Sequence, residues 1–103
     1  MEERFKLKTG VLEIFLPKEV DHHNAEEIRR TSDHLLEKSY VNSIIFDFKE
    51  TDFMDSSGVG MVLGRYKTIH FMGGNVFVRN VNARVDRMLA MAGVYRLIWK
   101  RED

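Results

Sequence analysis

The sequence predicts an α/β fold with a mainly parallel β-sheet, an antiparallel N-terminal edge strand and helices packed against the sheet. Segments with strand and helix patterns alternate in the order β-β-α-β-α-β-α-β, which is typical of parallel sheets with right-handed crossovers. Residues 43–48 are rich in apolar, β-branched and aromatic side chains, like a strand buried on both faces. A length of 103 residues suits one hydrophobic core, so we expect one domain over residues 1–103.

The first two strands are predicted to form an antiparallel hairpin over residues 4–16. Apolar and charged residues alternate on both sides of a Thr9-Gly10 turn, as expected for strands with one buried face. Pro17 has no backbone N–H and interrupts the pairing. We expect a loop from there to Asp21-His22-His23.

Three helices are predicted, each starting at a polar residue that can cap it. Asn24 is the expected cap of the first helix, the second begins near Ser56, and Asn82 caps the third. Gly73-Gly74 and Gly93 end the second and third helices. Apolar positions recur at helical spacing: Ala25, Ile28, Leu35 and Leu36, then Val59, Val62, Leu63, Tyr66 and Ile69, then Val85, Met88, Leu89 and Ala92.

The remaining strands are predicted between and after these helices. The strand at residues 43–48 leads into a loop over residues 49–54, and residues 76–78 form the next strand. Residues 95–99 are expected to form a last short strand.

The composition excludes several functional classes. Lys plus Arg and Asp plus Glu are 16 each, giving a net charge of zero, which argues against direct nucleic-acid binding and polybasic membrane contact. There are no cysteines, and therefore no disulfides or thiolate metal sites. The charged N-terminus does not resemble a signal peptide, and no apolar run approaches the roughly 18 residues that span a bilayer. We expect a cytoplasmic protein.

Residues 52–60 carry polar groups where a buried strand leads into a helix, and in parallel sheets sites gather at such junctions. Asp55 is the predicted N-cap, accepting a hydrogen bond from the backbone N–H of Ser57 or Gly58, with Met54 and Val59 as a hydrophobic staple. The hydroxyl of Ser57 is expected among unpaired N–H groups at the positive end of the helix dipole. A phosphoryl group there would meet donors already aimed at it.

Simpler interpretations of this segment remain open. Asp-Ser-Ser before an apolar helix is more often only a cap. The segment contains no G-x-S-x-G elbow. The glycines at 58, 60 and 64 resemble a dinucleotide fingerprint, but their spacing is G-x-G-x-x-x-G rather than G-x-G-x-x-G. We interpret Gly60 and Gly64 as close-packing positions on the helix.

The four histidines, His22, His23, His34 and His70, do not predict a metal site. His22 and His23 are adjacent and point in different directions, and no third ligand is spaced to join them. We predict structural or surface roles for all four, and no cofactor or metal.

Residues 53–67, from Phe-Met-Asp-Ser-Ser-Gly-Val-Gly onward, resemble the phosphorylation segment of the anti-sigma factor antagonists. These belong to the STAS domain family (sulphate transporter and anti-sigma factor antagonist). Residues 21–26 resemble the start of the first helix in the sporulation members, and residues 91–94 the end of the third. The similarity extends from about Val11 to Ile98, with Lys18 standing where members commonly have glycine.

The resemblance implies that Ser57 is phosphorylated by an anti-sigma factor that is itself an ATP-dependent serine kinase. The unphosphorylated protein would bind that kinase in its ADP-bound state and free the sigma factor, and a PP2C-type phosphatase would reverse the modification. The protein is then a monomeric substrate and switch rather than an enzyme. The expected partner-binding residues are Asp21, Asp55, Ser56, Gly58 and Gly60.

Two other functions are compatible with the same residues. One is a small nucleotide-binding or nucleotide-hydrolysing domain that uses the glycine-rich helix start. The other is a STAS sensor subunit of a larger signalling assembly, in which Ser57 is phosphorylated but no sigma factor takes part.

Overall fold

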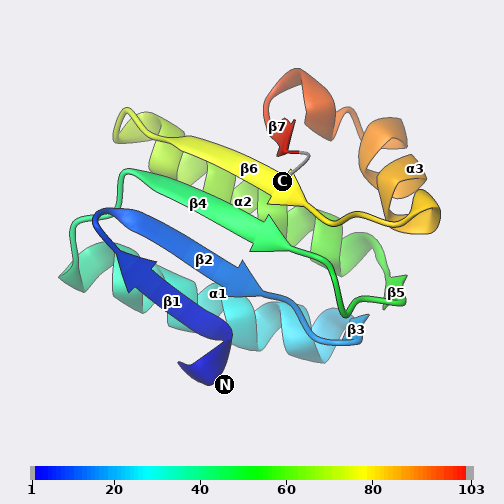
Figure 1. Ribbon diagram of the computed structural model, residues 1–103, viewed down its shortest axis with the longest axis horizontal. Coiled ribbons are helices and arrows are strands. Elements are labelled where there is room, and N and C mark those ends of the chain that lie inside the picture. The colour runs from blue at the N-terminus through cyan, green and yellow to red at the C-terminus, as the bar shows by residue number, and fades with distance from the viewer. Residues whose placement is uncertain (1, 102–103) are drawn as a thin grey trace.

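A five-stranded sheet in the order β1-β2-β4-β6-β7 forms the centre of the computed structural model, which describes residues 2–101 (Figure 1). Only β1 runs antiparallel to its neighbour, and the other pairs are parallel. The predicted mainly parallel sheet with an antiparallel edge strand is therefore confirmed. The strands are β1 (Phe5–Lys8), β2 (Val11–Phe15), β4 (Ser43–Asp47), β6 (Asn75–Arg79) and β7 (Trp99–Arg101), and a short 3₁₀ helix, η1 (Glu2–Arg4), precedes them.

The hairpin between β1 and β2 turns where the sequence predicts it. Thr9 and Gly10 have φ values of 53° and 81°, the positive pair that a two-residue turn needs to match the twist of the strands. Lys8 therefore pairs with Val11, and Phe5 with Ile14.

Two long helices, α1 (His22–Lys38) and α2 (Ser56–Phe71), cover one face of the sheet, and α3 (Ala83–Met91) lies beyond the carboxyl end of β6 (Figure 1). The core between sheet and helices consists of buried apolar side chains. It includes Leu12, Ile14, Ile44, Phe46, Val76 and Val78 from the strands and Ile28, Val62, Ile69 and Leu89 from the helices. No helix within residues 2–101 is long and apolar enough to cross a membrane.

The predicted cap of the first helix is wrong by three residues. Asp21, not Asn24, is the N-cap of α1, and its carboxylate accepts a hydrogen bond from the Asn24 N–H at 2.9 Å. The side-chain amide of Asn24 instead donates to the Glu19 carbonyl at 2.7 Å. Asp21 is preferred because it leaves a strand in extended conformation, the backbone geometry that a cap requires.

A second, two-stranded parallel sheet replaces part of the loops expected at residues 17–21 and 49–54. It pairs β3 (Glu19–Val20) with β5 (Phe53–Met54). Beside it, the Lys18 carbonyl accepts hydrogen bonds from the N–H groups of Asp52 and Phe53. Lys18 does not have a positive φ, so this turn does not require glycine at position 18.

The strand expected at residues 95–99 is also wrong. Residues 94–96 form a 3₁₀ helix, η2 (Val94–Arg96), and β7 begins only at Trp99. Gly93 ends α3 with a φ of 76°, and the chain then turns again so that Val94 becomes fully buried. Asp86 holds this segment, accepting hydrogen bonds from the Tyr95 hydroxyl at 2.5 Å and Lys100 Nζ at 2.9 Å.

Candidate functional site

The small β3–β5 sheet brings the N-termini of α1 and α2 together at the carboxyl end of the main sheet (Figure 1). Val20 pairs with Met54, so the next residue on each strand, Asp21 or Asp55, caps its own helix from the same register position. The Asp55 N–H donates to the Val20 carbonyl at 3.3 Å. Two helix starts with positive dipole ends therefore lie side by side.

Asp55 caps α2 as the sequence predicts, because its carboxylate accepts a hydrogen bond from the Ser57 N–H at 2.8 Å. Its carbonyl also accepts one from the Gly58 N–H at 3.0 Å. Met54 and Val59, the predicted staple residues, are both buried. Asp55 therefore already occupies two N–H groups of the first turn. A phosphate on Ser57 would interact with the helix dipole, but these two N–H groups are not free to bind it.

His22 contacts Ser57, a contact that the sequence pattern does not predict. Its Nδ1 lies 3.4 Å from the Ser57 Oγ, a distance at which the hydroxyl can donate to an unprotonated ring nitrogen. His22 directly follows the cap of α1, just as Ser56 follows the cap of α2. The sequence signal for this contact is that His22 and Ser57 each lie within two residues of the Asp that caps their helix. That signal predicts a contact only when β3 is known to pair with β5. The adjacent His23 instead lies 3.7 Å from Glu27.

The expected site residues lie close together, but they differ in how far each is exposed. Asp21, Asp55, Ser56 and Ser57 lie at the paired helix starts, where Ser56 is exposed and Ser57 is partly buried. Gly58 is buried beneath them, and Gly60 is exposed one turn further along α2.

The expectation that Gly60 and Gly64 are close-packing positions is wrong within the described chain. A Cβ on either residue would meet no atom within 4 Å. The close approach is at Gly58, where a Cβ would lie 2.5 Å from Cγ of Met54 and 2.9 Å from Cγ1 of Val20. Gly58 faces the core beneath β3 and β5, whereas Gly60 and Gly64 face open space.

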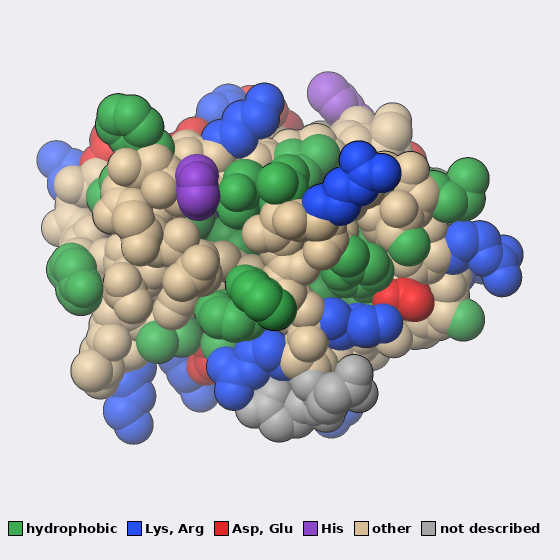
Figure 2. All heavy atoms as spheres, turned by 90° about the horizontal axis from the view of Figure 1, so that it is seen from above, with side chains coloured by type: hydrophobic (Ala, Val, Ile, Leu, Met, Phe, Trp, Pro, Cys, Tyr) green, Lys and Arg blue, Asp and Glu red, His purple; other side chains and the backbone are tan. Residues whose placement is uncertain are grey.

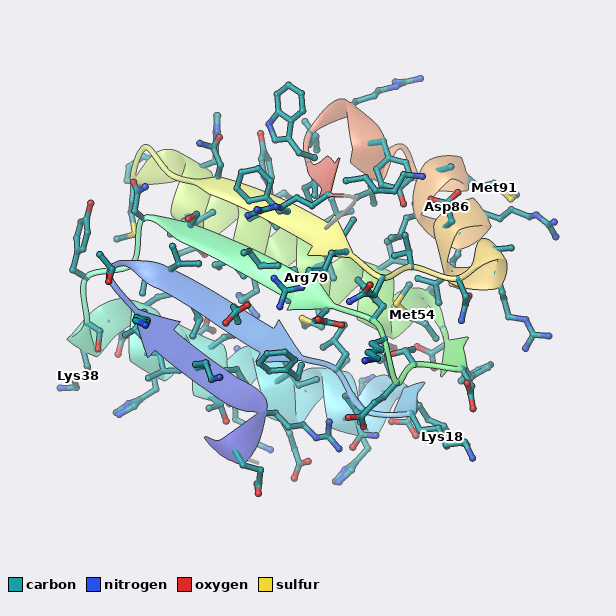
Figure 3. All side chains as sticks on the ribbon, viewed as in Figure 1. Lys18, Lys38, Met54, Arg79, Asp86 and Met91 are labelled. Atoms are coloured by element: carbon teal, nitrogen blue, oxygen red, sulfur yellow. The ribbon has the colours of Figure 1, made fainter. Side chains whose placement is uncertain are left out.

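An apolar groove of about 700 Å³ runs between α2 and α3 beside Ser56. Met54 from β5 and Met91 from α3 lie at the same end of the sheet (Figure 3). Figure 2 shows hydrophobic side chains exposed between Lys and Arg side chains on the face seen from above. The sequence does not predict this groove, because its walls come from segments far apart in the chain. They include Phe53, Met54, Val59, Leu63, Met88 and Met91, with Arg84 and Arg87.

A partly buried ion-pair network fixes the strand ends behind the site. Arg79, on the sheet face toward the viewer in Figure 3, donates from Nε to Asp47 at 2.8 Å and from Nη2 to Glu13 at 2.6 Å. Burial raises the pKa of Asp47, but hydrogen bonds from Arg79, the Lys49 N–H and Asn80 outweigh it and lower the pKa below its usual range. The turn that leaves β4 towards β5 is held by these contacts.

Comparisons with known proteins agree with this geometry. The sequence model of the STAS domain family matches residues 4–103. The anti-sigma F factor antagonist of Paenibacillus polymyxa is 39% identical over 89 residues, covering 86% of this chain and 76% of that protein.

Two solved structures of the anti-sigma factor antagonist SpoIIAA have the same fold. Its unphosphorylated form matches with a TM-score of 0.79 and 31% identity, covering 96% of this chain and 86% of that one. The phosphorylated form, from Bacillus, matches with a TM-score of 0.78 and 30% identity, covering 96% and 90%.

Proposed function

The chain belongs to the STAS domain family, and on this premise we propose that it is an anti-sigma factor antagonist that phosphorylation of Ser57 switches off. Its relatives named as anti-sigma F factor antagonists and the SpoIIAA structures support the regulatory role.

The observation that carries the choice of Ser57 is its position at the start of α2. Ser57 is the second helical residue, its hydroxyl contacts His22, and the neighbouring Ser56 is exposed. Its backbone N–H is fixed by Asp55, so the hydroxyl is presented from a rigid turn. Rigid presentation favours phosphoryl transfer, because that chemistry depends mostly on positioning.

In the unphosphorylated state the protein binds its anti-sigma factor through the surface around the paired helix starts. Asp21, Asp55, Ser56 and Gly60 form that surface, with Gly58 shaping it from below. The adjacent groove between α2 and α3 supports this proposal, since an exposed apolar groove rimmed by arginines suits a protein partner.

The partner that phosphorylates Ser57 is the anti-sigma factor itself, acting as an ATP-dependent serine kinase and binding the antagonist in its ADP-bound state. A PP2C-type phosphatase restores the hydroxyl. The family resemblance of residues 53–67 supports both assignments. The antagonist supplies the acceptor hydroxyl and the recognition surface, and the kinase supplies the nucleotide.

Incubation with ATP alone and then with the purified anti-sigma factor tests the proposal. We expect stoichiometric phosphate on Ser57 only when the partner is present, and a complex with the ADP-loaded partner only for the unphosphorylated protein. ATP turnover without a partner would instead support a nucleotide-hydrolysing domain. Phosphorylation by a kinase that does not bind a sigma factor would support a sensor subunit.

A further inference from the structure

Arg65 is a buried arginine whose hydrogen-bonding capacity is only partly used. It lies on α2 with 7% of its side chain exposed, and its Nη2 is 3.1 Å from Oδ1 of Asp33 on α1. Its Nε and Nη1 are closed to solvent and find no acceptor among residues 2–101. Burial lowers the pKa of this guanidinium, although Asp33 opposes that effect. Buried charged donors without acceptors are costly, so this arrangement needs an explanation.

Arg65 borders a groove of about 290 Å³ between α1 and α2, which begins at His22 and Ser57. Small residues keep it hollow, because Ala25 lies on one wall and a Cβ on Gly60 or Gly64 would meet nothing within 4 Å. On its other side Arg65 borders a second hollow of about 330 Å³. The Arg65 side chain therefore lies between two hollows, and a ligand in either one would meet its unpaired donors when the guanidinium turns toward it.

The charged residues that line the groove carry an excess of positive charge. They are two arginines, Arg29 and Arg65, and one carboxylate, Glu26, in an ion-pair network that also includes Arg30 and Asp33. The second hollow has the opposite balance, because two carboxylates, Asp33 and Glu37, line it beside Arg65. The groove between α1 and α2 therefore suits an anion better than the second hollow does.

We propose that the groove between α1 and α2 binds small oxyanions, carboxylates or phosphates, with the Arg65 guanidinium as their receptor. Arg29, which also lines the groove, is the second cation that such a ligand meets. Arginine suits this role because its N–H groups match the oxygens of both anions. Ser57 lines the same groove, so the site adds a small-molecule input beside the proposed acceptor hydroxyl, and it is tested in the unphosphorylated protein.

The test follows the side-chain Nε–H signal of Arg65 by NMR in the ¹⁵N-labelled chain, during titration with succinate or inorganic phosphate. The total ionic strength is held constant with NaCl. We expect a saturable shift of this signal, with succinate and phosphate distinguishing carboxylate from phosphate preference. Arg65→Gln identifies the signal by its loss. Binding to that variant, followed by the backbone amide signals of Gly60 and Gly64 in the groove, should be about tenfold weaker or more, the amount expected for a charged hydrogen bond.

Gly64→Leu is the variant that keeps the test decisive if Arg65→Gln does not fold. It extends into the groove from a position where an added Cβ meets no atom within 4 Å, so the fold should persist while binding is lost. Arg30→Gln, on the exposed side of the network, should bind normally. The proposal is overturned if no saturable shift occurs up to about 10 mM ligand, if NaCl alone reproduces it, or if Gly64→Leu binds as well as the wild type.

Discussion

The hydroxyl of Ser57 lies 3.4 Å from Nδ1 of His22, although 35 residues separate them in the chain. The contact follows from the pairing of β3 with β5, which sets Asp21 and Asp55 at equivalent positions and starts both helices at the same level. His22 can thus orient the hydroxyl that we propose as the phosphate acceptor.

The first prediction concerns this contact. His22→Ala should slow phosphorylation of Ser57 by about two- to tenfold, the effect of losing one hydrogen bond that holds the acceptor in place. The initial rate of labelling by the anti-sigma factor kinase measures it. His23→Ala is the matched control, since His23 lies next in sequence but pairs with Glu27. Equal rates for the His22→Ala protein and the wild type would show that the contact does not orient Ser57.

The second prediction separates the two serines. Ser57→Ala should abolish labelling yet still bind the ADP-loaded kinase, because removal of the hydroxyl leaves the Asp55 cap on the backbone N–H intact. Ser56→Ala should still be labelled, since the hydroxyl that His22 contacts belongs to Ser57. Mass spectrometry of the labelled proteins identifies the modified residue. Labelling of Ser57→Ala at the wild-type level would exclude Ser57 as the acceptor.

The third prediction compares two glycines of one helix. Gly60→Ala should raise the free energy of unfolding by about 0.5–1 kcal/mol, because alanine favours the helix and the new Cβ has free space. Gly58→Ala should lower it by about 1–3 kcal/mol, because the Cβ would press on buried Met54 and on Val20. Urea denaturation measures both. Similar stability changes in the two variants would contradict the packing described for Gly58.

The fourth prediction is a pH dependence. The folded-state pKa of Asp47 is lowered, so its contribution to stability is fully present above the unfolded value of about 3.9 and is lost as pH falls through the folded value. Asp47→Asn should cost about 1–3 kcal/mol at pH 7, where Arg79 loses a charged partner. Its stability should then fall less steeply in acid than that of the wild type.

Thermal melts of both proteins between pH 2 and pH 7 check this dependence. Asp52→Asn is the control, because Asp52 is exposed and its nearest cation, Lys18, is 3.9 Å away. A wild-type acid profile in Asp47→Asn would show that other carboxylates dominate acid unfolding.

The fifth prediction concerns the phosphorylated form. A phosphate on Ser57 adds about 1.5–2 negative charges beside Asp55, and the helix dipole offsets part of this by about 0.3–1 kcal/mol. We therefore expect unchanged secondary structure, a small change in melting temperature, and sharply weaker kinase binding through like-charge contact. The near-equal match of this fold to both forms of SpoIIAA agrees with that expectation.

Circular dichroism, a thermal melt and binding across a salt series measure these quantities. Added salt should partly restore binding, because the screening length falls from about 10 Å at 0.1 M to about 3 Å at 1 M. A large loss of helix on phosphorylation would contradict a switch confined to the surface. Loss of binding that is independent of salt would indicate a steric block.

Local patterns in the sequence predict the hairpin, the succession of main strands and helices along the chain, and the capping of α2 by Asp55. Each of these features depends on residues that are close in the chain. The Thr9-Gly10 turn and the apolar stripes are local, and the Asp55 carboxylate accepts a hydrogen bond from an N–H only two residues away. Such short-range interactions can be inferred without knowledge of the rest of the fold.

Only the tertiary structure decided how the residues of the site are brought together. The strands β3 and β5 have two residues each, too few to show an alternating pattern in the sequence. Their pairing places Asp21 as the cap of α1 and brings His22 next to Ser57. Gly58, Gly60 and Gly64 lie on the same helix, yet of these three only Gly58 faces Met54. Which side of the helix faces the neighbouring strands is set by packing. In the sequence, Arg65 is an ordinary charged residue of a helix, but in the fold α1 packs against it and Asp33 pairs with it. Burial depends on which segments pack together, and the residues adjacent in the chain do not specify this packing.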